Sequence, residues 1–154
     1  MQARQIHDGA RRVLVIACDK GEETVETVTR AVRAHDIRAA QVTGVGGLQG
    51  GQLGYFNRRS RDYTRIPITE QVEVLSLLGD VAEHDGQPVV HLHAVLGRED
   101  GSAFGGHLLA GQVWPVLEVI VTEVASSLAK RFDPQTGLTL LAPQAPIVHR
   151  PGAV

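Results

Sequence analysis

Three histidines, at positions 91, 93 and 107, have the spacing of a metal site built on two neighbouring strands. His91 and His93 belong to the β-branched apolar run from Val89 to Leu96, which follows a Gly-Gln-Pro turn and therefore predicts a strand. Because side chains alternate between the two faces of a strand, both imidazoles must point to the same side. Neutral imidazole binds zinc and also suits iron, nickel and copper.

His107 joins this pair if the chain turns back on itself. The polar, glycine-bounded segment 97–102 predicts a hairpin loop, and the run from Ala103 to Leu108 would then pair antiparallel with the first strand. A register that opposes His93 and His107 brings the third imidazole to the same face, whereas a slip of one residue turns it away. Three protein ligands with an open fourth position are typical of catalytic zinc sites. We therefore predict a transition-metal site, with zinc as the expected metal, at His91, His93 and His107.

Other uses of the histidines stay open, because a strand histidine is often satisfied by a carbonyl or carboxylate and a His-x-His pair can line a polar subunit contact. Two carboxylates, Glu73 and Glu118, stand among apolar residues of strand-like runs. A buried carboxylate requires a partner. Each of the two is therefore either a solvent-facing residue of an alternating strand or a partner that orients an imidazole from behind the metal.

A second cluster is basic and lies between two strand-like runs. Its members are Arg58, Arg59, Arg61 and Arg65. The segment predicts a solvated hairpin tip, and it is also the candidate phosphate or DNA contact, because guanidinium groups match phosphate geometry and Tyr63 can stack on a base. The formal net charge of the whole chain is -2, whereas a protein built mainly to hold nucleic acid is more often basic.

The remaining segments predict the framework that positions these residues. Strands are expected at 13–18, buried and central, at 37–43, at 72–78 and at 112–124, and a helix is expected from about Glu22 to His35 with Val25, Val28 and Val32 as its apolar stripe. The glycine-rich segment 44–51 predicts a tight turn or a bulge and not a phosphate loop, because a strand and not a helix follows it. Segment 125–133 predicts a turn or short helix, 136–141 a last strand, and 142–154 an extended proline-rich tail.

Length and composition predict one globular domain over residues 1–154. The chain has 43% hydrophobic and 21% charged residues, which is ordinary for a folded domain. The single cysteine, Cys18, lies in an apolar run and excludes an internal disulfide, which is typical of a protein in a reducing compartment. No apolar run is long enough to cross a membrane, so we expect a cytoplasmic protein.

Five segments, taken in order, resemble the PPC domain (plants and prokaryotes conserved) family. They are Thr43–Gly46 leading to Leu53–Phe56, Val72–Asp80, His91–Ala94, Gly105–Leu108 and Glu118–Ile120, within a core of about 13–125. The resemblance implies an α/β (α+β) fold, in which a helix packs on a mostly antiparallel sheet, and assembly as a homotrimer. It also implies that the three histidines form the metal site of the stand-alone bacterial and archaeal members.

Three functions follow from the residues and the resemblance together. Plant members carry AT-hooks and act as nuclear DNA-binding proteins, so bacterial relatives carry a provisional DNA-binding, transcription-associated label. This sequence contains no Arg-Gly-Arg-Pro core, so the minor-groove reader of the plant proteins is missing from it. The alternatives are a metal-dependent small-molecule enzyme, a hydrolase or lyase, and a trimeric scaffold that recruits partners.

Overall fold

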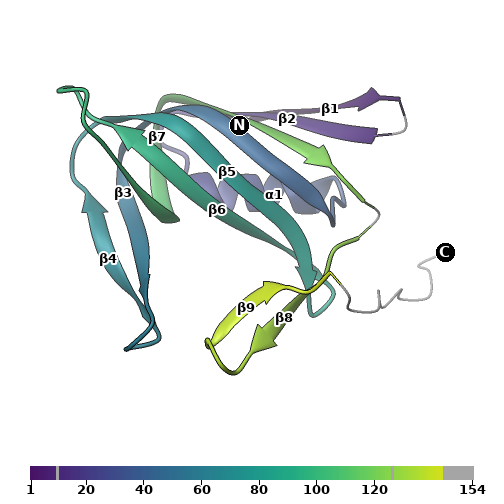
Figure 1. Cartoon of the computed structure of the whole chain (residues 1–154). Coiled ribbons are helices and arrows are strands. Elements are labelled where there is room, and N and C mark those ends of the chain that lie inside the picture. Colours follow the sequence, from purple (N-terminus) through teal and green to yellow (C-terminus); the bar gives the residue numbers. More distant parts are fainter. Residues whose placement is uncertain (10, 126, 144–154) are drawn as a thin grey trace.

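The computed structural model describes residues 1–9, 11–125 and 127–143, and strands dominate this part of the chain (Figure 1). Its elements are β1 (Gln2–Asp8), β2 (Arg11–Asp19), α1 (Thr24–Ala34), β3 (Ala40–Asn57), β4 (Asp62–Ile68), β5 (Val72–His84), β6 (Gln87–Gly97), β7 (Ala103–Glu123), β8 (Lys130–Asp133) and β9 (Leu138–Leu141). The fold is a mostly antiparallel sheet with one helix in a single domain, as the sequence predicts. None of the helices in the described ranges is long and apolar enough to span a membrane.

The seven strands of the main sheet follow the order β1-β2-β7-β6-β5-β3-β4, and β3 also pairs with β7. The pairings among β3, β5, β6 and β7 therefore form a closed ring, which fixes the register of each of these strands from two sides. The polar N-terminal segment forms the edge strand β1. β8 and β9 form a separate two-stranded hairpin beside the end of β5 (Figure 1).

The helix lies close to its predicted span, because its N-terminal cap and its apolar stripe both fit the same stretch of residues. The carboxylate of Glu23 accepts a hydrogen bond from the backbone N–H of Glu26 at 2.7 Å and so caps the first turn. Val28 and Val32 are fully buried and join the core that the sheet covers. Burial of each of these valines contributes about 2 kcal/mol, so packing and not intrinsic propensity holds the helix in place.

The glycine-rich segment is a bulged part of the continuous strand β3, so the predicted bulge is confirmed and the predicted turn is wrong. Pairing with β5 shifts register between Gly44 and Gly46, and pairing with β7 shifts nearby. A Cβ atom on Gly47 would lie 2.2 Å from the carbonyl oxygen of Trp114 on β7. The glycines therefore permit two long strands to approach closely, and this approach takes the place of a turn.

Two further sequence expectations differ from the structure. Segment 125–133 was expected to form a turn or short helix, but Lys130–Asp133 is strand β8, because it pairs with Leu138–Leu141 in register. The strand over 13–18 is not buried on both sides, since Leu14 and Ile16 are fully buried whereas Val15 is 39% exposed. Of the expected proline-rich tail, residues 144–154 lie outside the described part of the chain.

One face of the main sheet stays open in the single chain and carries a group of exposed apolar side chains. The residues that define this open face are Val15, Val45, Leu78, Val95 and Ile120, all at least 39% exposed. Val15 lies opposite Ile120, and Leu78 lies opposite His93, so by cross-strand register the open face continues into the histidine strand. The opposite side chains of the same strands, such as Leu14, Val119 and Leu92, are buried in the core.

The close approach of β3 to β7 predicts different tolerance of two neighbouring glycines. Gly47→Ala is expected to lower the free energy of unfolding by about 2–3 kcal/mol, because the new methyl group meets a backbone carbonyl that has no room to move. Gly50→Ala is the matched control, since its Cβ would meet only the carbonyl oxygen of Ile68 at 3.3 Å, and a loss below about 1 kcal/mol is expected. Urea unfolding measures both, and equal losses would contradict the packing argument.

Candidate metal centre

The three histidines meet on one face, in the register that the sequence analysis assumed. His93 lies directly opposite His107 in the β6–β7 pairing, and His91 lies two residues from His93 on the same side of β6. One ring nitrogen from each histidine lies within 4.8 Å of the other two. The ring centroids are 5.0 to 5.2 Å apart. Since a zinc–nitrogen bond measures about 2.0–2.1 Å, small side-chain rotations bring the three nitrogens to one ion.

A carboxylate orients one of these imidazoles. Asp80 lies opposite His91 in the β5–β6 pairing, and its Oδ2 accepts a hydrogen bond from Nδ1 of His91 at 3.1 Å. A histidine that donates Nδ1–H to a carboxylate keeps the lone pair of Nε2 free for a metal. The ammonium group of Lys130, only 5% exposed, forms an ion pair with Oδ1 of the same carboxylate at 2.7 Å. His91, Asp80 and Lys130 therefore form a continuous polar chain.

The ionisation of His93, His107 and Asp80 is compatible with metal binding. Burial, helped by the nearby His91 and His93, lowers the pKa of His107 to about 4, and burial also lowers the pKa of His93. Burial acts to raise the pKa of Asp80, but hydrogen bonds from His91 and Lys130 outweigh it, so this pKa lies below its ordinary value. At neutral pH, His93 and His107 thus offer uncharged imidazoles near a charged carboxylate.

A buried ring nitrogen without a hydrogen-bond partner in the described part of the chain also fits a metal site. Nδ1 of His107 is buried and has no hydrogen-bond partner among residues 1–9, 11–125 and 127–143. A buried ring nitrogen without a partner costs free energy unless a ligand or an ion takes the place of the missing contact. The donor set, the orienting carboxylate and this nitrogen together fit a transition metal.

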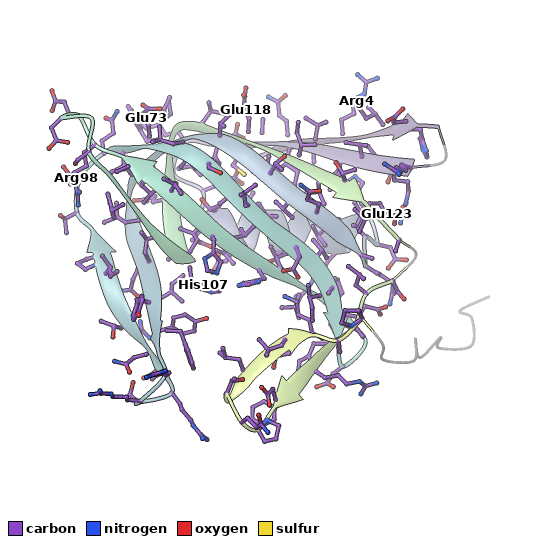
Figure 2. All side chains as sticks on the ribbon, viewed as in Figure 1. Arg4, Glu73, Arg98, His107, Glu118 and Glu123 are labelled. Carbon is purple, nitrogen blue, oxygen red and sulfur yellow. The ribbon has the colours of Figure 1, made fainter. Side chains whose placement is uncertain are left out.

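The histidines border a cavity of about 780 Å³. Figure 2 shows His107 below the main sheet, on the side where the β3–β4 and β8–β9 hairpins extend. Aromatic residues of the first hairpin line the cavity, and the ring of Tyr63 packs 4.9 Å from that of His107. Leu138 and Leu140 of β9 line it from the other side. A metal at the histidines would therefore face space that a small molecule can enter.

The two glutamates named from the sequence lie elsewhere. Glu73 is exposed and lies opposite Gly97, four residues along β6 from His93. Glu118 is exposed on β7 between Ala17 and Val45. Figure 2 places both along the upper side of the sheet, with His107 below it. Of the two alternatives for these residues, the solvent-facing one agrees with their positions, and the carboxylate beside the histidines is Asp80.

The arginine cluster is the solvated hairpin tip that the sequence predicts. Arg58, Arg59 and Arg61 are exposed in the turn between β3 and β4, and Arg65 is exposed further along β4, opposite Gly54. Arg65 donates a hydrogen bond from Nη1 to Oε1 of Gln52 at 3.0 Å. The tip belongs to the hairpin that contributes Tyr63 to the cavity, but none of the four arginines lines the cavity.

Comparison with known proteins agrees with this arrangement. The sequence pattern of the Plants and Prokaryotes Conserved (PCC) domain matches residues 6–125, which contain all three histidines and Asp80. The chain belongs to this family. It is the same family, abbreviated PPC above, that the order of the sequence motifs resembles.

Two solved structures resemble this PPC chain over nearly their whole length. A metal-containing protein from Archaeoglobus fulgidus is 30% identical, with a TM-score of 0.78 over 84% of this chain and 92% of that protein. A protein from Bacteroides thetaiotaomicron, provisionally described as DNA-binding, is 24% identical, with a TM-score of 0.83 over 93% of this chain and 99% of the other. At 24% identity, the likeness to the Bacteroides thetaiotaomicron protein concerns the fold alone.

A longer relative also contains a PPC-like region. The bifunctional protein GlmU of a Synechococcus strain is 30% identical over 135 residues, which are 84% of this chain. The chain spans only 20% of the length of that relative. The similarity therefore concerns a part of the larger protein.

Asp80 and Lys130 are the residues of the PPC site that the sequence analysis did not select. A signal for Asp80 exists, because the Asp85-Gly86 turn sets His84 opposite Gln87, and counting back along this hairpin brings Asp80 opposite His91. Lys130 gives no such signal. It reaches Asp80 from a strand that follows the whole main sheet, and only the tertiary fold brings the two together.

Proposed function

We propose that this protein is a metal-binding PPC-domain homotrimer in which His91, His93 and His107 hold a transition metal, with zinc as the expected ion. The observation that carries the proposal is the convergence of three imidazoles, with the Asp80 carboxylate hydrogen-bonded to one of them. The 30% identical protein from Archaeoglobus fulgidus, described as metal-containing, supports it. Three histidine ligands would leave a coordination position open, and the three histidines line the cavity.

The chemistry of the site follows from what its own residues do. A zinc ion bound in this way supplies Lewis-acid chemistry, which polarises a carbonyl group or activates water, so hydrolase or lyase activity is the enzymatic form of the proposal. Asp80 holds His91 in one tautomer and orientation. Tyr63, packed against His107, shields the cluster from solvent on the side of the β3–β4 hairpin.

The open face supports the trimer. Its five apolar residues come from five different strands, and Val15 lies directly opposite Ile120. Soluble monomers seldom expose a broad apolar patch without a partner. A second copy of the chain is the occupant that the family resemblance implies. Association through this face would bury side chains such as Val15 and Ile120 next to the histidine strand.

DNA binding is the second candidate function, and the exposed arginine tip favours it. Four guanidinium groups on one protruding hairpin suit phosphate contacts, and three copies in a trimer would multiply them. The Bacteroides thetaiotaomicron relative carries a provisional DNA-binding description. The overall charge of -2 acts against this function, because phosphate neutralisation dominates such affinity.

Metal analysis tests the first candidate directly. Protein purified without chelator is expected to carry about one equivalent of zinc or another transition metal per chain, and the His91→Ala/His93→Ala variant is expected to carry almost none. Loading with zinc should raise the melting temperature of the unchanged protein only, because the metal binds the folded state. His7→Ala, outside the cluster, is the control. A folded protein that refuses metal would contradict the proposal, and steeply salt-dependent duplex binding weakened by Arg59→Ala would then favour the second candidate.

Asp80→Asn is expected to weaken zinc binding about tenfold or more while the protein stays folded. The amide no longer supplies the charge that orients and polarises His91. Competition with a fluorescent chelator measures the affinity. Glu73→Gln and Glu118→Gln are matched controls that should leave it unchanged, and an equal effect of Glu73→Gln would transfer the orienting role away from Asp80.

Ile120→Glu is expected to convert the trimer into single chains, because it places a carboxylate in the middle of the open face. Sedimentation velocity distinguishes the two states. Phe132→Glu is the matched control, since Phe132 is 62% exposed on β8, away from the five residues of the open face. A variant that stays trimeric would exclude this face as the interface.

A further inference from the structure

The cavity beside the histidines has the size and lining of a small-molecule site. Its volume of about 780 Å³ falls within the range that ligand pockets occupy. Apolar and aromatic side chains form most of its walls, and they come from both hairpins and from β6. The residues that matter for the argument are Tyr55, Phe56 and Tyr63 on one side and Val90, Leu138 and Leu140 on the other.

Four polar residues that line the cavity lie close together. His91, His93 and His107 converge, and Lys130 is connected to His91 through Asp80. Lys130 is a long cationic side chain held 95% out of solvent, although a lysine normally keeps its ammonium group in water. The site therefore combines an apolar body with a single polar end, which is the pattern of a pocket for an amphipathic molecule.

The charges at this end favour an anion. Both oxygens of Asp80 are engaged, Oδ2 with His91 and Oδ1 with Lys130, so the carboxylate is already neutralised by the lysine. An ammonium group has three N–H donors, and within the described residues Asp80 is the polar partner recorded for Lys130. A divalent metal on the histidines would add uncompensated positive charge beside the remaining donors. A ligand with a pair of anionic oxygens would both accept hydrogen bonds from these donors and balance the positive charge of the metal.

We propose that the cavity binds a small organic carboxylate with an apolar body. One carboxylate oxygen would occupy the open position at the histidine-bound metal and the other would accept a hydrogen bond from Lys130. The apolar body would lie between the β3–β4 and β8–β9 hairpins, against Tyr63 and Leu140. The proposal rests on the metal-binding function proposed above, and it names the class of molecule on which that site acts.

The test uses 4-phenylbutyrate as the probe and the full chain, first analysed for its metal content and then loaded with zinc. Isothermal titration compares the probe with 4-phenylbutyramide, which keeps the apolar body without the charge, and with acetate, which keeps the charge without the body. Each comparison compound is expected to bind about tenfold more weakly or worse. Equal affinity for the amide would overturn the anionic end of the proposal, and equal affinity for acetate would overturn the apolar part.

Variants locate the binding within the cavity. Lys130→Met keeps the length of the side chain and removes its charge, and it is expected to weaken probe binding about ten- to a hundredfold. Lys20→Met, at an exposed lysine outside the cavity, is the matched control. Leu140→Gln changes a residue that is 42% exposed, so folding is not at risk, and it is expected to weaken the probe about fourfold.

The outcomes separate this proposal from the one on which it rests. If the chain carries zinc and the probe does not bind, the metal function stands and the carboxylate proposal is overturned. If the chain refuses zinc, the metal function fails, and titration of the metal-free protein still decides about the cavity. If the metal-free protein binds the probe and binding requires Lys130 and Leu140, a carboxylate pocket is supported. If the probe does not bind, for example because a second copy of the chain fills the cavity, the carboxylate pocket is overturned.

Discussion

The register between β6 and β7 is the constraint on which the site depends. His93 opposes His107, and a slip of one residue would turn His107 away from the other two imidazoles. The opposite face of the same strands enforces the register, because Leu96 and Leu108 are buried and a slip would expose such side chains to water. β7 is fixed from its other side as well, where His107 lies opposite Gly54 of β3. Packing of the core thus determines where the imidazoles meet.

Holding three imidazoles together has an electrostatic cost that the structure keeps small. Protonated histidines at this spacing would repel one another, and burial already disfavours the charged form, so the pKa values of His93 and His107 are lowered. The charge that remains is localised on Asp80 and Lys130, which neutralise each other behind His91. His93 and His107 therefore keep nitrogen lone pairs available for a metal ion, which binds only deprotonated ligands.

The sequence predicted those parts of the molecule that local pattern determines. Alternation in 89–96 was enough to place His91 and His93 on one face, and the spacing of Val28 and Val32 was enough to locate the helix. The register of His107 had to be assumed, because loop length alone does not fix it, and its confirmation came from the structure. The glycines of β3 were compatible with a turn or a bulge, and local pattern alone could not show that they accommodate the neighbouring strand β7 in a bulged strand.

Residues brought together from distant parts of the chain escaped prediction for a physical reason. Lys130 lies fifty positions after Asp80, and neither strand propensity nor charge pattern links them. Glu73 and Glu118 drew attention because a carboxylate in apolar company looks buried, but on an alternating strand the same pattern also fits the exposed face. To decide whether these carboxylates are buried or exposed, one must know which face of each strand is covered. Only the packing of the helix and the closed ring of strands determines that.

The positions of the two candidate functional surfaces make them physically separable. The histidines and Lys130 lie at the polar end of a cavity of about 780 Å³, which admits a small molecule but not a nucleic-acid duplex. The arginines protrude from the tip of the β3–β4 hairpin, outside the cavity lining, where a polyanion could reach them. The hairpin that carries the arginines also supplies Tyr63 to the wall beside His107. The two candidate surfaces therefore share one structural element, although they share no residue.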